Sequence, residues 1–176
     1  MTDKKFVIAH TWDGQSITEQ DQVSLSLRCD VHFLYVDMVA PFYCDPAPSQ
    51  APTSTWGLWE YEVVEAFLVG EDGHYTELEW GPHGHFLALR LDAPRSITHK
   101  EDPMEYTTKI EGEKWYGFAK ISREFLPSTI NRINFFAIHG VGESRQYLAY
   151  HPLPDSKPNF HQPHRFPLFL ESSFYV

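Results

Sequence analysis

Two glutamates lie in a segment whose other residues suit the interior of a protein, Trp56–Leu68. Successive side chains of an extended strand point to opposite faces, so Glu62 and Glu65 fall on opposite faces, each among apolar neighbours. A carboxylate in apolar surroundings is costly unless it is hydrogen-bonded or paired. Arg132 or Arg145 could pair with these groups, which would make them structural; otherwise they are candidate ligand-binding groups.

A second pair of glutamates, Glu77 and Glu79, shares one face of a short predicted strand that ends at Trp80. The Cα atoms of residues two apart in a strand are roughly 6.5–7 Å apart, which overlaps the separation of about 5–9.5 Å between glycosidase carboxylates. Carboxylates also accept hydrogen bonds from sugar hydroxyls, and aromatic rings pack on the C–H faces of sugars. Trp56, Trp59 and Trp80 are the aromatic candidates closest in sequence to these acids.

Histidines add a second kind of chemistry. His83 and His85 follow the glutamates in a Gly-Pro-His-Gly turn, and His161 lies near the C-terminus. Histidine with carboxylate suits zinc or non-haem iron, but the chain has no His-Glu-x-x-His motif or spaced cysteine and histidine set. The alternative to simple ligand binding is a small metal-dependent or carboxylate-based hydrolase that uses Glu77/Glu79 with His83/His85.

The composition excludes several classes of protein. The 176 residues carry 24 Asp+Glu against 14 Lys+Arg, a net charge of −10, whereas nucleic acids and anionic membranes select basic patches. Ten of the acids lie between Cys29 and Leu89, a stretch without Lys or Arg, which is either a solvated acidic face or a cation site. Two cysteines are too few for a disulfide framework, so we expect a cytoplasmic protein.

The elements that would position these residues are strands. Short segments of alternating apolar and polar residues are separated by prolines and glycines, a pattern typical of half-buried strands. About ten strands without long helices predict an all-β fold, a single antiparallel β-sandwich spanning residues 1–176. The expected strands are 6–10, 23–29, 31–39, 61–69, 75–80, 85–91, 105–110, 115–121, 133–139 and 147–150. Residues 41–57 form a long loop, and the proline-rich tail 152–167 runs extended across the surface.

The order of four segments resembles a known fold. These are Leu58-Trp-Glu-x-x-Val-Val-Glu-x-Phe-Leu68, Tyr75-x-Glu-x-Glu79 with its Pro-x-Gly turn, Tyr147-Leu-Ala149 and Pro158-Asn-Phe-His161. Together they resemble the DOMON-like sandwich related to carbohydrate-binding module family 9, and most closely an uncharacterised family of that fold. The resemblance covers residues 56–166 and implies a β-sandwich whose relatives bind sugars, or haem in some members, and can hold structural calcium.

These observations together predict a non-catalytic domain that binds a small molecule, a carbohydrate or a related polyhydroxylated ligand. No nucleic-acid or membrane partner is expected. Of the cofactors that the resemblance implies, structural calcium is retained, whereas haem is not expected because no motif surrounds the internal methionines Met38 and Met104. The predicted ligand-binding residues are Trp56, Trp59, Glu62, Glu65, Glu77, Glu79, Trp80, His83 and His161.

Overall fold

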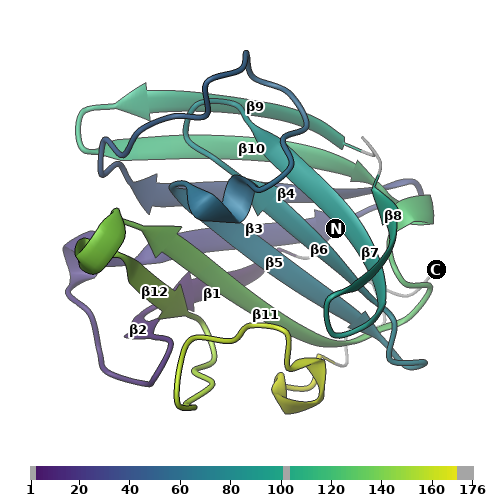
Figure 1. The fold of residues 1–176 in the computed structure, drawn as a ribbon. Coiled ribbons are helices and arrows are strands. Elements are labelled where there is room, and N and C mark those ends of the chain that lie inside the picture. Colours follow the sequence, from purple (N-terminus) through teal and green to yellow (C-terminus); the bar gives the residue numbers. More distant parts are fainter. Residues whose placement is uncertain (1–2, 101–103, 170–176) are drawn as a thin grey trace.

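The protein is built from antiparallel strands in two sheets that pack face to face (Figure 1). The computed structural model describes residues 3–100 and 104–169. The five-stranded sheet consists, in spatial order, of β1 (Lys4–Ile8), β3 (Val23–Cys29), β4 (Phe33–Pro41), β10 (Lys114–Ser122) and β9 (Met104–Glu111). The seven-stranded sheet consists, in spatial order, of β2 (His10–Thr11), β12 (Gln146–Ala149), β11 (Ile130–His139), β5 (Val63–Gly70), β6 (Tyr75–Trp80), β7 (Phe86–Ala93) and β8 (Ser96–Lys100). The predicted antiparallel β-sandwich is confirmed.

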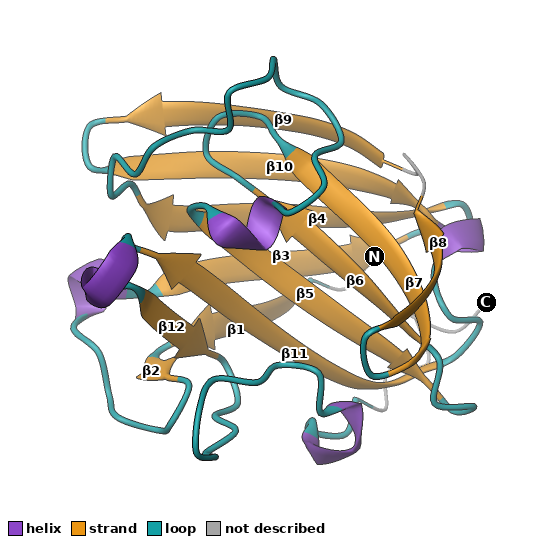
Figure 2. Ribbon diagram, viewed as in Figure 1, coloured by secondary structure: helices purple, strands orange, loops and turns teal. Residues whose placement is uncertain are grey.

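The helices in the described part of the chain are single 3₁₀ turns, four in connections between strands and one, η5, in the tail after β12 (Figure 2). They span Glu19–Asp21 (η1), Leu58–Glu60 (η2), Arg123–Phe125 (η3), Gly142–Ser144 (η4) and Pro163–Arg165 (η5). Gly57, which precedes η2, has a φ of 79°, a left-handed conformation that favours glycine. No helix among the described residues has the length and apolar character needed to span a membrane.

The interior between the two sheets collects one face of most strands. On β5 this face carries Val64, Ala66 and Leu68, and on β6 it carries Leu78 and Trp80. Burial of such a continuous apolar layer is the main favourable contribution to folding, at about 25 cal/mol per Å² of apolar surface.

The prediction that Trp80 forms part of a ligand platform is wrong. Its side chain is 0% exposed in the core between the sheets, and its indole Nε1 donates a hydrogen bond to Met104 Sδ at 3.2 Å. The cause is the alternation itself: Trp80 lies on the face of β6 opposite to Glu77 and Glu79.

The outer face of the seven-stranded sheet is also covered, which explains why all eight residues of β5 are buried. A second apolar cluster there contains Phe67 of β5 and Phe136 of β11, and the tail contributes Leu153, Phe160 and Phe166. The extended tail therefore forms a partial third layer over this face (Figure 1). The candidate site lies between the sheet and this layer.

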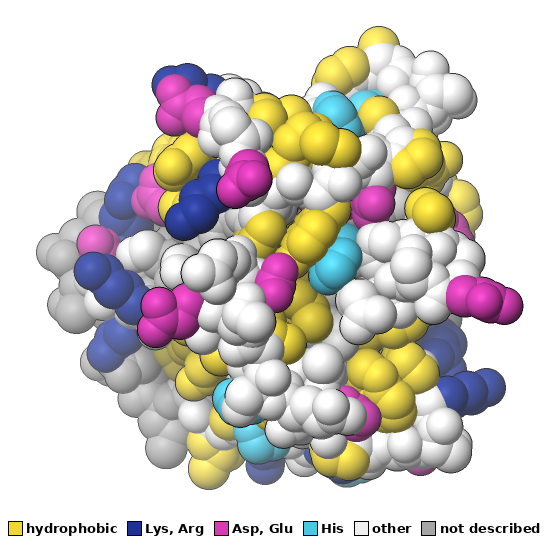
Figure 3. Space-filling model, turned by 90° about the vertical axis from the view of Figure 1, so that its left-hand side faces the viewer, with side chains coloured by type: hydrophobic (Ala, Val, Ile, Leu, Met, Phe, Trp, Pro, Cys, Tyr) yellow, Lys and Arg dark blue, Asp and Glu magenta, His cyan; other side chains and the backbone are white. Residues whose placement is uncertain are grey.

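The surface is chemically mixed despite the net negative charge. On the face shown in Figure 3, hydrophobic side chains gather in several groups between acidic, basic and histidine side chains. Exposed large hydrophobic residues include Trp56, which is 55% exposed.

Candidate functional site

A pocket of about 390 Å³ opens on the outer face of the seven-stranded sheet. Strands β5, β6, β7 and β11 form its floor, the tail segment 158–161 forms one wall, and the chain from Arg95 to Ile97 contributes to its rim. This volume is at the small end of the range of about 300–1,000 Å³ for ligand pockets. The lining residues are Trp56, Trp59, Glu65, Phe67, Glu77, Leu89, Leu91, Arg95, Ile97, Ile138, Tyr147, Pro158, Asn159, Phe160 and His161.

Three glutamates come together at the floor of this pocket because of the strand register. Glu65 of β5 pairs directly with Glu79 of β6, and Glu77 lies two residues before Glu79 on the same face. The side chains of Glu65, Glu77 and Glu79 are 2%, 4% and 0% exposed. One carboxylate oxygen from each lies within 4.8 Å of the other two. We call these residues the glutamate cluster.

The surroundings of the glutamate cluster disfavour ionisation. Burial raises the pKa of Glu77 to about 8, and burial with repulsion from neighbouring carboxylates raises the pKa of Glu65 and Glu79 well above the usual range. Both oxygens of Glu79 and Oε2 of Glu77 have no hydrogen-bond partner of ordinary geometry among the described residues. Without a cation, the cluster therefore holds protons that exposed glutamates would lose near pH 4–5.

The two arginines considered as partners bind elsewhere. Arg145 donates hydrogen bonds to the carbonyl oxygens of Trp59 and Glu60, and its charge only weakly opposes the raised pKa of Glu65. Arg132 donates to the carbonyl oxygen of Phe166 at 2.6 Å. In the described part of the chain, neither forms an ion pair with a strand glutamate, so the alternative in which an arginine pairs with Glu62 or Glu65 is not realised.

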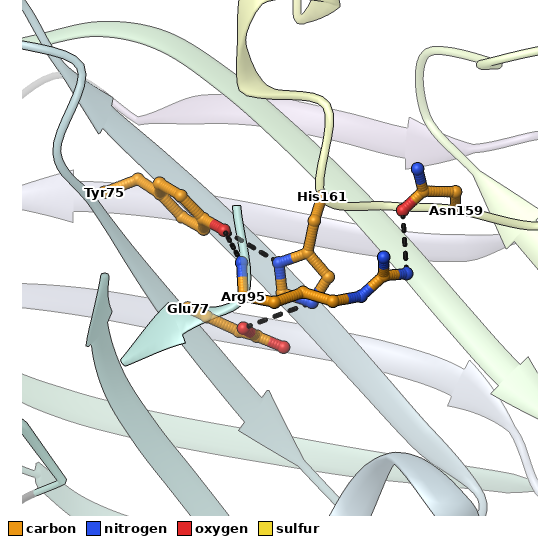
Figure 4. A network of polar contacts seen from close by, with 5 residues as sticks. All are labelled: Tyr75, Glu77, Arg95, Asn159 and His161. Carbon is orange, nitrogen blue, oxygen red and sulfur yellow. Dashed lines mark hydrogen bonds and ion pairs between the residues drawn. The ribbon is translucent and has the colours of Figure 1, made fainter. Parts of the chain in front are cut away.

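His161 reaches the glutamate cluster from the tail (Figure 4). Its Nδ1 is hydrogen-bonded to the Tyr75 hydroxyl at 2.8 Å, and its Nε2 lies 4.0 Å from Oε2 of Glu77. The backbone N–H of Arg95 donates to the same Tyr75 hydroxyl at 3.3 Å, and the Arg95 guanidinium donates to Asn159 at 3.0 Å. Burial, with repulsion from Arg95, lowers the pKa of His161 to about 4, so the imidazole is neutral at pH 7.

Two tryptophans form the rim of the pocket. Trp56 and Trp59 meet edge to face, with ring centroids 5.1 Å apart and an interplanar angle of 79°. Trp59 packs against the outer apolar cluster, whereas Trp56 is mostly exposed, with the Lys100 ammonium 5.3 Å from its ring centre. Their exposed aromatic surface adjoins the carboxylates of the floor.

Most of the predicted site residues lie in or beneath this one pocket. Trp56, Trp59, Glu65, Glu77 and His161 line it, and Glu79 lies below its floor. The predicted residues outside it are Glu62, Trp80 and His83.

Glu62, which directly precedes β5, has a structural environment. Its carboxylate accepts hydrogen bonds from the backbone N–H groups of Tyr43 and Asp45, at 3.2 and 3.4 Å. These bonds attach the start of the long loop to the sheet. Burial nonetheless raises the pKa of Glu62 to about 7.

The histidine pair is also separate from the glutamate cluster. His83 packs edge-on against Phe42, and Nε2 of His85 is hydrogen-bonded to the Gln50 carbonyl at 2.9 Å. Both line a small cavity beside Glu62 and do not line the large pocket. The combination of Glu77/Glu79 with His83/His85, which the hydrolase alternative requires, is therefore not assembled.

Several residues in or beside the pocket were not predicted. Asn159 lines the pocket, and Tyr75 is hydrogen-bonded to His161. Both lie in segments that carry the family resemblance, so that resemblance was a usable signal for them. Arg95 had no signal, because it lies in a turn between strands β7 and β8, where arginine is an ordinary surface residue.

Comparison with known proteins identifies relatives of unassigned function. The chain is 36% identical to the human "UPF0462 protein C4orf33" over 165 residues, which are 89% of this chain and 82% of the human one. It is 34% identical to the zebrafish (Danio rerio) homologue over 166 residues, 89% of this chain and 84% of that protein. No family model matches the chain.

A solved structure shares the fold. The crystal structure of a "putative carbohydrate-binding protein" from Bacteroides uniformis superimposes with a TM-score of 0.72, over 96% of this chain and 85% of that one. The sequence identity is 14%, so the likeness extends to the β-sandwich alone.

Proposed function

The chain belongs to the UPF0462 family, and we propose that it is a non-catalytic domain whose pocket binds a carbohydrate or a related polyhydroxylated small molecule. One observation carries the proposal: a single cavity joins exposed tryptophan surface with carboxyl groups and an imidazole. A sugar offers C–H faces that pack on aromatic rings and hydroxyls that hydrogen-bond to polar groups.

The size and shape of the pocket support a short ligand. A volume of about 390 Å³ suits one or two sugar rings better than a long chain. The tryptophan rim provides the apolar contact, while Glu65, Glu77 and Asn159 provide hydrogen-bonding groups at the floor and wall. The fold shared with the Bacteroides uniformis protein is consistent with this class of ligand.

A thermal-shift screen of the purified full chain against monosaccharides and disaccharides tests the proposal. A ligand at 100 times its dissociation constant adds about 2.7 kcal/mol, or roughly 5–10 °C for a domain of this size. We expect such a shift with one sugar class. Trp59→Ala is expected to reduce it because the variant loses aromatic surface at the rim of the pocket.

Tyr116→Ala is the matched control, since Tyr116 is an aromatic residue on the five-stranded sheet, 40% exposed and outside this pocket. This variant is expected to keep the full shift. The absence of a shift with every sugar, or an unchanged shift in Trp59→Ala, would overturn the proposal.

A further inference from the structure

The glutamate cluster and His161 form an arrangement that sugar binding alone does not require. Three buried carboxyl groups lie close together beneath a pocket. The imidazole of His161, from a distant part of the chain, points at one of them, Glu77 (Figure 4). We propose that Glu65, Glu77, Glu79 and His161 bind one divalent transition-metal ion, Mn²⁺ or Zn²⁺, at the floor of the pocket.

The distances suit a single ion. Oxygen and nitrogen ligands lie about 2.0–2.2 Å from zinc, so two ligands of one ion are about 3–4.4 Å apart. Nε2 of His161 lies 4.0 Å from Oε2 of Glu77 but is not within 4.8 Å of all three carboxylates, so the imidazole would have to move toward the cluster to complete the site. The carboxylate oxygens, all within 4.8 Å of one another, need to move by only a few tenths of an ångström.

The unpaired oxygens of Glu79 independently indicate a missing partner. The side chain is 0% exposed, and its contacts with the Trp59 backbone N–H and the Glu77 carboxyl group do not have ordinary hydrogen-bond geometry. Burying a polar group without a partner costs roughly 1–3 kcal/mol. An ion held between Glu79 and its two neighbours would satisfy these oxygens and Oε2 of Glu77 together.

Tyr75 holds His161 in the orientation that a metal ligand needs. Its hydroxyl oxygen can accept a hydrogen bond from Nδ1 of His161, which leaves the lone pair on Nε2 facing Glu77. Metal-bound histidines almost always make such a bond through their other ring nitrogen. The N–H of Arg95 fixes the Tyr75 hydroxyl in turn.

The charges near the cluster leave room for a cation. The guanidinium of Arg95 is hydrogen-bonded to Asn159, and that of Arg145 to backbone carbonyl oxygens. Neither forms an ion pair with the cluster among the described residues. A divalent ion could therefore balance the negative charge of the three carboxylates in place of bound protons.

The donor set selects the class of metal. Carboxylates suit magnesium, calcium and manganese, whereas imidazole suits zinc, iron, nickel and copper. Three carboxylates with one imidazole thus favour Mn²⁺ or Zn²⁺ over Ca²⁺ and Mg²⁺. The inference goes beyond the proposed function, because it concerns the floor of the pocket and does not require the ligand to be a sugar.

The experiment is isothermal titration of the EDTA-treated full chain with Mn²⁺, Zn²⁺, Ca²⁺ and Mg²⁺, each added alone. We expect one equivalent of Mn²⁺ or Zn²⁺ to bind more tightly than Ca²⁺ or Mg²⁺. Glu79→Gln and His161→Ala should each weaken this binding at least about tenfold, since each removes one ligand.

Glu62→Gln is the matched control, because Glu62 is a buried glutamate that directly precedes β5 and lies outside the glutamate cluster. It should bind the ion like the unmodified chain. Circular dichroism of each variant establishes that it is folded, and Glu79→Gln replaces a carboxyl with a neutral group of nearly the same shape.

Absence of Mn²⁺ and Zn²⁺ binding would overturn the inference, as would unchanged binding in folded Glu79→Gln or His161→Ala. Preferential binding of Ca²⁺ that does not depend on His161 would also overturn it. A sugar screen on the EDTA-treated protein separates the two proposals: sugar binding there, without metal binding, removes this inference and leaves the proposed function in place.

Discussion

Buried glutamates in this chain differ in what surrounds their carboxyl groups. Glu62 accepts two backbone hydrogen bonds, whereas Glu79 meets other carboxyl groups. Both side chains are almost completely buried, so exposure alone does not separate a structural acid from a candidate ligand. What separates the two is whether the carboxylate oxygens are hydrogen-bonded to the backbone or lie beside other carboxyl groups.

Glu62 provides a pH test at the scale of one residue. Its pKa is about 7 in the folded protein and near 4.5 in an unfolded chain. The folded state therefore takes up the proton more readily. The resulting contribution to the free energy of unfolding is fully present below pH 4.5 and is lost as the pH rises through 7.

Glu62→Gln cannot titrate at this position, so the difference in stability between the two proteins should change across this window. We expect the unmodified chain to lose on the order of 1–2 kcal/mol relative to Glu62→Gln between pH 4.5 and 7.5. Urea unfolding of both proteins at four pH values measures this difference. Parallel stability curves would contradict the environment described for Glu62.

At the scale of elements, the face of a strand decides whether an aromatic residue is core or rim. Trp80 of β6 lies between the sheets, whereas Trp56 lies on the loop before η2, over the outer face. In the sequence, the alternation of side chains along β6 already placed Trp80 on the opposite face from the two glutamates. This alternation did not show which of the two faces the second sheet would cover.

The two tryptophans should therefore respond differently to truncation. Trp80→Ala is expected to lower the free energy of unfolding by about 3–5 kcal/mol, because it leaves a cavity in the core. Trp56→Ala should change it by less than about 1 kcal/mol, since the side chain is 55% exposed. Urea unfolding at one pH measures both, and similar losses in the two variants would contradict the assignment.

The strands were largely predictable because most of them bury at least one face. Residues 23–29 and 75–80 match β3 and β6 at both ends. Strand β8 was missed because all five of its residues are exposed, so it carries no apolar alternation. Strand β2 has two residues, too few for any period to show.

The site was less predictable than the strands, for a physical reason. Alternation placed Glu77 and Glu79 on one face, but the pairing of Glu65 with Glu79 depends on register between strands, which no single segment encodes. His161 reaches the cluster only through the path of the tail. The glutamates were identified individually, and their convergence came from the whole fold.

At the scale of the whole molecule, the tail completes the pocket. Phe160 stacks on Phe136 of β11 with ring centroids 3.9 Å apart and an interplanar angle of 8°. Its neighbours Asn159 and His161 supply polar groups to the pocket wall. This contact acts together with the hydrogen bonds between Asn159 and Arg95 and between His161 and Tyr75 to hold both groups over the sheet.

Phe160→Ala should loosen the tail while leaving the sandwich folded. We expect faster hydrogen exchange at amides bonded within the tail, such as Gln162 to Phe160 and Phe166 to Pro163. Amides of β3 and β4 in the other sheet should keep their protection.

The same variant should also weaken binding of a sugar or metal ion at least about tenfold, because His161 would no longer be held near the glutamates. The control variant Tyr116→Ala should alter neither tail hydrogen exchange nor ligand binding. Unchanged tail exchange together with unchanged binding would mean that the pocket does not depend on this contact, and that the tail is held over the sheet by its other apolar side chains, Leu153 and Phe166.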